Sequence, residues 1–240
     1  IYSPYAGRSY PTRVLWGDQH LHSSWSADAG GAGATLDPEA ALRFARGEQV
    51  VSSTGQPVQL SRPLDWLVVA DHSDGMGIIN ELLRGNPQLL AEPVVRRWYD
   101  MMKGGREQAK AAVMEIIEAQ SNNRIPAVMK DPALAMTVWQ KSTAIMDRYN
   151  EPGRFTAIIG FEWTSGPDGN NLHRNVLFRD GKDKADQILP FSAWQSEDPE
   201  KLWEWMAKYE EKTGGRMLAI PHNGNLSNGR MFELVDFAGK

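Results

Sequence analysis

Short apolar runs alternate with amphipathic segments along the chain. The runs at 64–70, 155–161 and 216–220 are rich in β-branched and aromatic residues, which predicts buried strands. The run Val14, Leu15 and Trp16 predicts the end of another buried strand, and the alternating segment 174–178 predicts a further one. Helical patterns lie between these runs. This alternation predicts an α/β fold with a largely parallel sheet.

Three predicted helices begin with the same signal, an aspartate followed by a proline. The aspartate offers a capping carboxylate, and the proline suits the first helical turn. The signal occurs as Asp37-Pro38, Asp131-Pro132 and Asp198-Pro199. From about 87 to 150 the pattern is wholly helical, which predicts a helical insertion between two strands. Residues 47–63 have the composition of turns and predict a loop or a small hairpin.

The composition narrows the classes of partner. The net charge of −4 over 240 residues shows no excess of positive charge of the kind that binding to nucleic acid requires. A small-molecule substrate is therefore favoured. Since the chain has no cysteine, any metal must be held by His, Asp or Glu. No run is as long as a membrane span. The start at Ile1 and the absence of cysteine favour a periplasmic or secreted location, and the oligomeric state stays open.

All five histidines lie beside predicted strand ends. His20 and His22 follow the first run, His72 follows the second, and His222 follows the last. Glu162 also follows a strand directly. In parallel α/β folds, and above all in barrels, the carboxyl ends of the strands are where sites are built. The sequence therefore favours a barrel with a polar site at one rim.

His173 precedes a strand instead of following one. The segment 165–171 is rich in turn residues, so the strand that ends at Glu162 can reverse and return antiparallel. This reversal brings His173 to the same rim as Glu162. His20 and His22 are two residues apart and face the same way on a strand, with the spacing that two ligands of one metal need. Asp18 shares that face as a candidate to orient them.

These motifs, in this order, resemble the PHP superfamily, the polymerase and histidinol phosphatase domain, and most closely a branch catalogued as domain of unknown function 3604. The motifs are GDQHLHSSWSAD (17–28), ADHSD (70–74), GFEWT (160–164), NLHRN (171–175) and IPHNGN (220–225). The resemblance implies a distorted, seven-stranded, TIM-like barrel with up to three zinc, manganese or iron ions. It also implies hydrolysis of phosphate esters.

The resemblance also implies which residues bind each metal. His20, His22 and Glu162 would hold the first metal; Glu162 would bridge to a second held by His173 and His222; Asp28 and His72 would hold a third. Asp71 would support these ligands. The residues expected to act in catalysis are His20, His22, Glu162 and His222. The family has a further Asp-x-His motif near its end. This chain lacks that motif, and only Asp236 could stand in for it as a carboxylate. Residues 1–240 are therefore expected to be one domain, the amino-terminal portion of a longer protein with an incomplete barrel.

Substrate contacts are predicted at Arg174, Asn171 and Asn223. A guanidinium suits phosphate, although Arg174 is equally a candidate surface charge, and asparagines in loops are commonly turn formers. Asn170 and Asn225 share that ambiguity, and Trp25 and Trp163 are either ring-stacking or packing residues. The favoured function is phosphoester hydrolysis by metal-activated hydroxide. The alternatives are a metal-dependent hydrolase of C–N or C–O bonds and a non-catalytic barrel that acts as a binding module.

Overall fold

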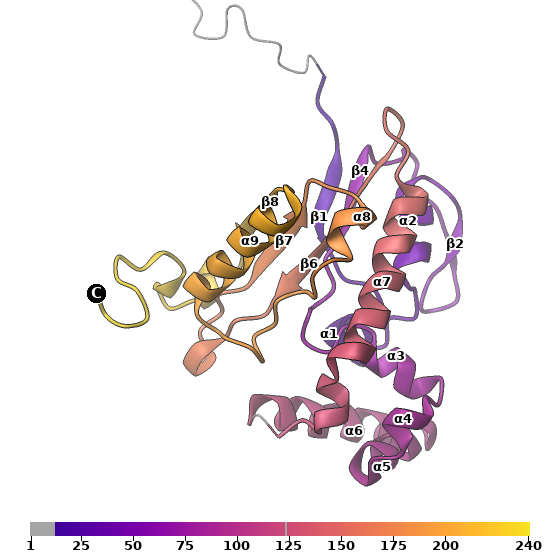
Figure 1. The fold of residues 1–240 in the computed structure, drawn as a ribbon. Coiled ribbons are helices and arrows are strands. Elements are labelled where there is room, and N and C mark those ends of the chain that lie inside the picture. The colour runs from indigo at the N-terminus through magenta and orange to yellow at the C-terminus, as the bar shows by residue number, and fades with distance from the viewer. Residues whose placement is uncertain (1–12, 123) are drawn as a thin grey trace, which may run out of the picture.

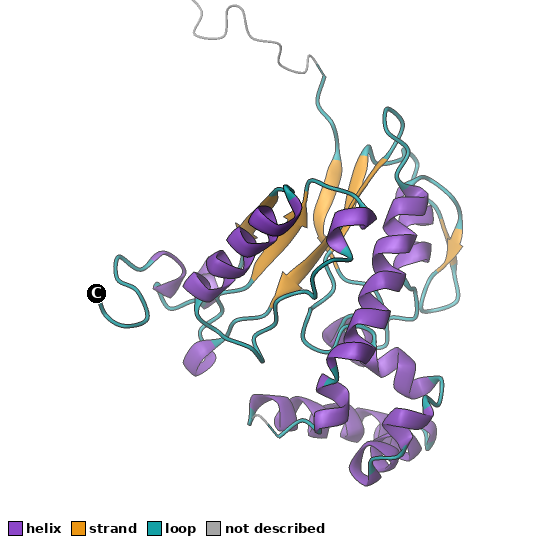
Figure 2. Ribbon diagram, viewed as in Figure 1, coloured by secondary structure: helices purple, strands orange, loops and turns teal. Residues whose placement is uncertain are grey.

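The computed structural model describes residues 13–122 and 124–240, which form a mixed α/β fold (Figure 2). The strands are β1 (Gly17–Leu21), β2 (Val50–Val51), β3 (Pro57–Val58), β4 (Trp66–Val69), β5 (Thr156–Ile158), β6 (Gly160–Trp163), β7 (Arg174–Phe178) and β8 (Met217–Pro221). The α-helices are α1 (Ala27–Gly31), α2 (Pro38–Ala45), α3 (Ile78–Leu83), α4 (Pro87–Leu90), α5 (Pro93–Lys103), α6 (Arg106–Ser121), α7 (Pro132–Tyr149), α8 (Lys182–Ala185) and α9 (Pro199–Thr213).

The strands form three small sheets. β1, β4 and β5 make a parallel sheet in that order, β6, β7 and β8 make an antiparallel sheet, and β2 pairs with β3 as a hairpin. Among the described residues none of these sheets closes on itself. The predictions of a seven-stranded PHP-type barrel and of a largely parallel sheet are therefore wrong. The hairpin expected within 47–63 is confirmed.

The chain changes sheets within the segment that was predicted as one strand. Residues 155–161 contribute β5, which pairs with β4, and the start of β6, which pairs with β7. Gly160 lies at this crossing, where a β-carbon would come within 2.6 Å of Val68 Cγ1 and 2.9 Å of the Val176 carbonyl oxygen. A parallel bridge between His72 and Glu162 joins the two sheets again just beyond the crossing. The strand ends therefore converge without forming a barrel. The sequence pattern of polar residues at strand ends fits both arrangements.

Val14, Leu15 and Trp16 do not form a buried strand. Their exposed fractions are 65%, 49% and 59%, and β1 begins only at Gly17. Leu218 in β8 is also exposed, at 58%. β1 and β8 are the outer strands of their sheets, so within the described chain one edge of each lacks a neighbouring strand. The apolar sequence alone did not distinguish these outer strands from central ones.

The three predicted helix starts are confirmed. Asp37 accepts a hydrogen bond from the Ala40 N–H at 2.9 Å, Asp131 from Ala133 at 2.9 Å, and Asp198 from Glu200 at 2.9 Å. In each case the following proline opens the helix. These helices are the ones that cover the sheets: α2, α7 and α9 all contribute residues to the core formed with β4 to β7.

Helices α3 to α7 lie between β4 and β5 in the chain, where the helical insertion was expected. The first four of them form a group with its own apolar core, closed by the start of α7. Its buried residues are Ile78, Leu82, Leu89, Val95, Trp98, Ala112, Ile116, Ile125, Met129 and Leu134. Figure 1 shows this group beyond the carboxyl ends of β1 and β4, next to α1. The helical group therefore faces the strand ends that bear His20, His22 and His72.

Candidate metal centre

Glu162 lies at the centre of the candidate site. It belongs to β6, is 1% exposed, and is paired across the sheet with Asn175 and through the bridge with His72. Its carboxylate contacts one ring nitrogen of every histidine in the chain. The distances are 3.2 Å from His20 Nε2, 2.6 Å from His22 Nε2 and 3.7 Å from His72 Nδ1 to Oε2, and 2.6 Å from His173 Nδ1 and 2.8 Å from His222 Nε2 to Oε1.

The five imidazoles form a closed circuit around this carboxylate. Neighbouring ring centroids are 5.0 Å apart for His20 and His22, 4.6 Å for His22 and His72, 5.5 Å for His72 and His173, 5.9 Å for His173 and His222, and 4.0 Å for His222 and His20. The antiparallel return from β6 to β7, predicted from the turn-rich segment, is confirmed and brings His173 to Glu162. Both sheets thus contribute to one cluster.

Asp28 adds a second carboxylate on the side of the helical group. It lies in the first turn of α1, and its side chain is 55% exposed. Its oxygens are 3.1 Å from His22 Nδ1 and 3.4 Å from His72 Nε2. His22 therefore lies between the two carboxylates, with Nδ1 toward Asp28 and Nε2 toward Glu162.

The charges of the cluster favour ionised carboxylates. Burial raises the pKa of Glu162, but contacts with His173, His22 and His222 outweigh burial and hold this pKa well below its usual range. Burial likewise opposes ionisation of Asp28, while His22 and His72 hold the Asp28 pKa well below its usual range. For His22, burial lowers the pKa, but Asp28 and Glu162 prevail and raise it to about 10. Burial, and then repulsion from His222, lower the pKa of His20.

The donor set fits divalent metal ions. Among the described residues three groups hold ligand atoms within 4.8 Å of one another: His20, His22 and Glu162; His22, Asp28 and His72; and His72, Glu162 and His173. Two ligands of one metal lie about 3.0–3.4 Å apart when each bond is about 2.1 Å long. Three of the contacts above lie in this range, at 3.2 Å for His20 and Glu162, 3.1 Å for His22 and Asp28, and 3.4 Å for His72 and Asp28. His22 Nε2 and His222 Nδ1 are buried without a hydrogen-bond partner, although His22 Nε2 lies close to Glu162. Of these two atoms, His22 Nε2 faces the cluster and is available to a metal, whereas the His222 nitrogen that faces Glu162 is Nε2.

Two serines hold the ends of β1 and β4 together. The Asp71 carboxylate is buried just after the end of β4. It accepts hydrogen bonds from the Ser23 N–H at 2.6 Å and from Ser23 Oγ at 2.7 Å. Burial raises the pKa of Asp71 to about 6, against the opposing effect of the Ser23 hydrogen bonds. Ser26 Oγ accepts from the His72 N–H at 3.1 Å and lies 3.2 Å from His22 Nδ1. Asp71 thus acts on the ligands through Ser23 and the backbone.

Thr164 and Asp74 support His72, and neither was assigned a role from the sequence. Thr164 Oγ1 lies 2.6 Å from His72 Nδ1, and Thr164 in turn lies beside the carboxylate of Asp74, which is 1% exposed. Burial raises the pKa of Asp74. Both residues lie two positions after a candidate ligand, Thr164 after Glu162 and Asp74 after His72. Neither residue lies in a strand, so this spacing does not indicate a shared face, and their contact with His72 is seen only in the three-dimensional structure.

A family model described as "Protein of unknown function (DUF3604)" matches residues 9–240. The chain belongs to the DUF3604 family. Comparison with curated proteins and comparison with solved structures both find no match. The sequence motifs that resemble this family contain every residue of the histidine and carboxylate cluster.

In this DUF3604 protein, Arg174 lies away from the cluster. Along β7 it alternates with His173 and Asn175, so it is on the opposite face of the strand, 5% exposed and stacked 5.7 Å from Trp163 and 5.3 Å from Trp203. It donates a hydrogen bond to the Leu172 carbonyl at 2.6 Å. The structure therefore does not bring this guanidinium to the histidines.

Of the other polar candidates, Asp18, Asn171 and Asn170 have local hydrogen-bond partners. The Asp18 carboxylate accepts from the His20 N–H at 2.8 Å, and Asn171 Oδ1 accepts from the His173 N–H at 3.1 Å. Asn223 is exposed with a φ of 58°, and Asn225 is also exposed, whereas Asn170 is buried and donates to the Pro167 carbonyl at 2.8 Å. Asp18 and Asn171 therefore hold the backbone at His20 and His173.

The two candidate stacking tryptophans are buried in packed surroundings. Trp25 is 6% exposed within the main core, and Trp163 is fully buried with its Nε1 donating to the Ser196 carbonyl at 3.2 Å. The structure therefore places both rings in the packing of the core.

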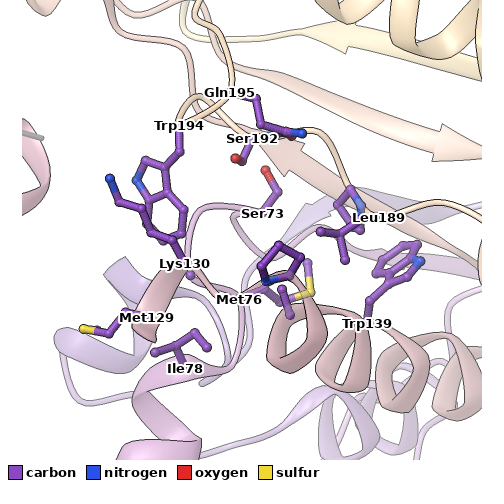
Figure 3. Close-up of a pocket in the computed structure, with 14 residues that line it drawn as sticks. Ser73, Met76, Ile78, Met129, Lys130, Trp139, Leu189, Ser192, Trp194 and Gln195 are labelled. Carbon is purple, nitrogen blue, oxygen red and sulfur yellow. Dashed lines mark hydrogen bonds between the residues drawn. The ribbon is translucent and has the colours of Figure 1, made fainter. Parts of the chain in front are cut away.

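One cavity adjoins the cluster, and a second adjoins the first. One, of about 290 Å³, reaches Asp28 and His72; the other, of about 540 Å³, shares Asp74, Gln120 and Thr164 with it. Within the described part of the chain neither is lined by lysine or arginine. A third cavity, of about 230 Å³, is lined by residues that include Ser73, Met76, Trp139 and Trp194, and none of the candidate ligands lines it (Figure 3). In the described residues no helix has the length and apolar character to cross a membrane.

Proposed function

We propose that this protein is a hydrolase that depends on divalent metal ions. The observation that carries the proposal is the position of Glu162, a buried carboxylate within 3.7 Å of a ring nitrogen of each of five histidines. A lone histidine usually has a structural role, but five around one carboxylate form a donor set with few other uses. Imidazole and carboxylate ligands without thiolate suit zinc, manganese or iron.

The two oxygens of Glu162 divide the histidines into two sets, which supports a bridging role for this residue. Oε2 faces His20, His22 and His72, whereas Oε1 faces His173 and His222. Asp28 with His22 and His72 offers a further position. Up to three metal ions are proposed on this basis. When bound, they lower the pKa of water toward neutrality and stabilise the charge that develops on the reacting group.

The favoured substrate is a phosphate ester, in which water replaces the alcohol at phosphorus, the P–O bond to the alcohol breaks, and the leaving oxygen takes up a proton. In support, the ordered motifs resemble the PHP superfamily, and membership of that superfamily is part of the proposal. The chain itself contributes Thr164, which orients His72, and Asp71, which fixes the β1 end through Ser23. Both keep the ligands in position before the substrate binds.

A second candidate is hydrolysis of a neutral C–O or C–N bond. It is favoured by the lack of lysine and arginine among the described residues that line the two adjoining cavities, and by Arg174 lying on the far face of β7. A phosphate dianion is commonly recognised by such cations, whereas a carboxylic ester or amide does not need them.

The test combines metal analysis with a substrate panel. The full chain, purified without chelator, is expected to bind at least one manganese, iron or zinc ion and to hydrolyse phosphomonoesters or phosphodiesters. Glu162→Gln keeps the shape of the side chain but removes its charge, so metal binding and hydrolysis should both be lost. Glu211→Gln, at an exposed position of α9, is the matched control and should keep both.

Two outcomes of this experiment would overturn the proposal in different ways. Less than one metal per wild-type chain in excess manganese or zinc would rule out the metal-dependent hydrolase. Cleavage of only carboxylic esters or amides, lost in Glu162→Gln, would replace the phosphoesterase with the second candidate.

A further inference from the structure

The cavity of about 290 Å³ opens directly beside two candidate metal ligands. Asp28 and His72 form part of its lining, together with Thr164 and Asp74 from the supporting residues. Helices α1, α3 and α6 supply the rest of the wall. The remaining lining residues are Ala27, Gly31, Ile79, Val113, Ile116 and Gln120. A group bound here would lie next to a reacting bond at the metal centre.

The wall contributed by the helices is apolar. Val113 and Ile116 lie one turn apart on α6, and Ile116 is 7% exposed within the core of the helical group. Gly31 allows a close approach of α1 to α6, because a β-carbon there would come within 3.1 Å of Val113 Cγ1. Gln120, one turn beyond Ile116, is the amide among the described lining residues. This composition suits an uncharged apolar group.

The charges around the cavity disfavour an anionic group at the same place. Asp28 and Asp74 are its carboxylates, and no lysine or arginine lines it among the described residues. The adjoining cavity adds Glu197 and also Asp168, whose carboxylate is paired with Arg230 at 3.4 Å. An additional phosphate or carboxylate on the organic part of a substrate would therefore be disfavoured beside Asp28 and Asp74.

The size sets a further limit. A cavity of roughly 150 Å³ holds benzene, so the volume of about 290 Å³ has room for one or two fused rings or a branched aliphatic group of similar size. Small polar alcohols such as glycerol would leave much of the apolar wall without contacts.

We propose that the substrate has an uncharged, apolar organic group, aromatic or branched aliphatic, that binds between α1, α3 and α6 while its reacting bond lies at His72 and Asp28. This inference rests on the proposed function for the reacting bond, but the binding of the apolar group can be measured without any reaction. It separates this substrate class from sugar phosphates and other esters of polar alcohols.

The first experiment measures binding of 2-naphthol to the full chain by calorimetry, with and without manganese. Val113→Phe fills the cavity and Ile116→Lys places a charge in it, so each should weaken binding about tenfold or more. Met114→Lys is the matched control on α6, because Met114 is 58% exposed and outside the lining. Circular dichroism checks that the variants fold. If Ile116→Lys does not fold, Val113→Phe alone serves as the test.

Absence of naphthol binding to the wild type, or equal binding by wild type and Val113→Phe, would overturn the inference. The second experiment compares 2-naphthyl phosphate with glycerol phosphate in excess manganese, and the naphthyl ester should have the lower KM by about tenfold or more. Equal KM values would overturn the inference while leaving the hydrolase in place. Naphthol binding without hydrolysis of any ester would instead overturn the proposed function. The assignment of the cavity as a binding site for an apolar group would then remain.

Discussion

At the scale of single residues, the site depends on a balance between buried carboxylates and imidazoles. Glu162 is almost fully buried, which alone would favour its neutral form, yet the surrounding histidines keep it ionised. His22 contacts both Glu162 and Asp28, and these contacts raise its pKa from 6.5 to about 10. Without metal, the proton on His22 therefore supplies the positive charge that two carboxylates require, and a metal ion must replace it.

This balance predicts opposite effects of pH on the metal-free and the metal-bound protein. Because the folded pKa of His22 lies above its ordinary value, the stabilisation is fully present below pH 6.5 and is lost as the pH rises toward 10. The free energy of unfolding of chelator-treated protein should therefore fall by about 1–2 kcal/mol between pH 6.5 and 9.5, with solvent at half-exposed Asp28 reducing the full effect. Urea unfolding measures this change.

The control is His22→Gln, which keeps a polar side chain without the titrating ring. Its stability should change less with pH than that of the wild type over the same interval. Manganese affinity of the wild type should rise with pH, because the imidazole binds metal only after it loses the proton. A metal-free stability that stays constant from pH 6.5 to 9.5 would contradict the role assigned to His22.

The five histidines and Glu162 were predictable from the sequence because each lies within six residues of a predicted strand, whereas Asp28 was expected only from the resemblance to the PHP superfamily. Thr164 and Asp74 were missed, since hydroxyl and carboxylate groups are common and only the three-dimensional contact with His72 distinguishes them. Arg174 illustrates the opposite case. It is adjacent to His173 in sequence, but successive residues of a strand face opposite ways, and the structure buries it against Trp163 and Trp203.

At the scale of elements, the crossing from β5 to β6 positions Glu162. The chain pairs with β4 before Ile159 and with β7 after it, so Glu162 can reach both His72 and His173. The helix starts and the hairpin were predictable because their signals are local. The division of 155–161 was not, since it depends on the contacts of Gly160 with Val68 and Val176, which are distant in sequence.

Gly160→Ala should therefore destabilise the protein. The new methyl group would lie 2.6 Å from Val68 Cγ1 and 2.9 Å from a backbone oxygen that cannot move freely. Overpacking of this kind costs about 1–3 kcal/mol, which thermal or urea unfolding can resolve. Gly166→Ala is the matched control, because a β-carbon at Gly166 meets no atom within 4 Å. Equal stability of the two variants would show that the crossing tolerates a side chain.

At the scale of the whole molecule, the cluster connects parts of the fold that otherwise share few strand contacts. His20, His22 and His72 come from the parallel sheet, Glu162, His173 and His222 from the antiparallel sheet, and Asp28 from α1 beside the helical group. The sequence predicted this convergence but assigned it to a seven-stranded barrel, incomplete at its C-terminus. Convergence of strand ends requires only that two sheets meet, here at Ile159 and at the bridge from His72 to Glu162, so the barrel did not follow from it.

Because the candidate metal ligands come from both sheets, metal binding should stabilise the folded chain as a unit. At a free metal concentration of about 100 times Kd, a ligand that binds only the folded state adds about 2.7 kcal/mol. For a chain of this size that corresponds to a rise in Tm of about 5–10 °C. Calorimetry of chelator-treated protein with and without manganese measures the shift, and a single cooperative transition is expected in both.

Glu162→Gln removes the carboxylate that joins the two sheets, so its shift should be much smaller. A shift of equal size in wild type and Glu162→Gln would place the bound metal elsewhere, since no other residue contacts all five histidines in the described chain.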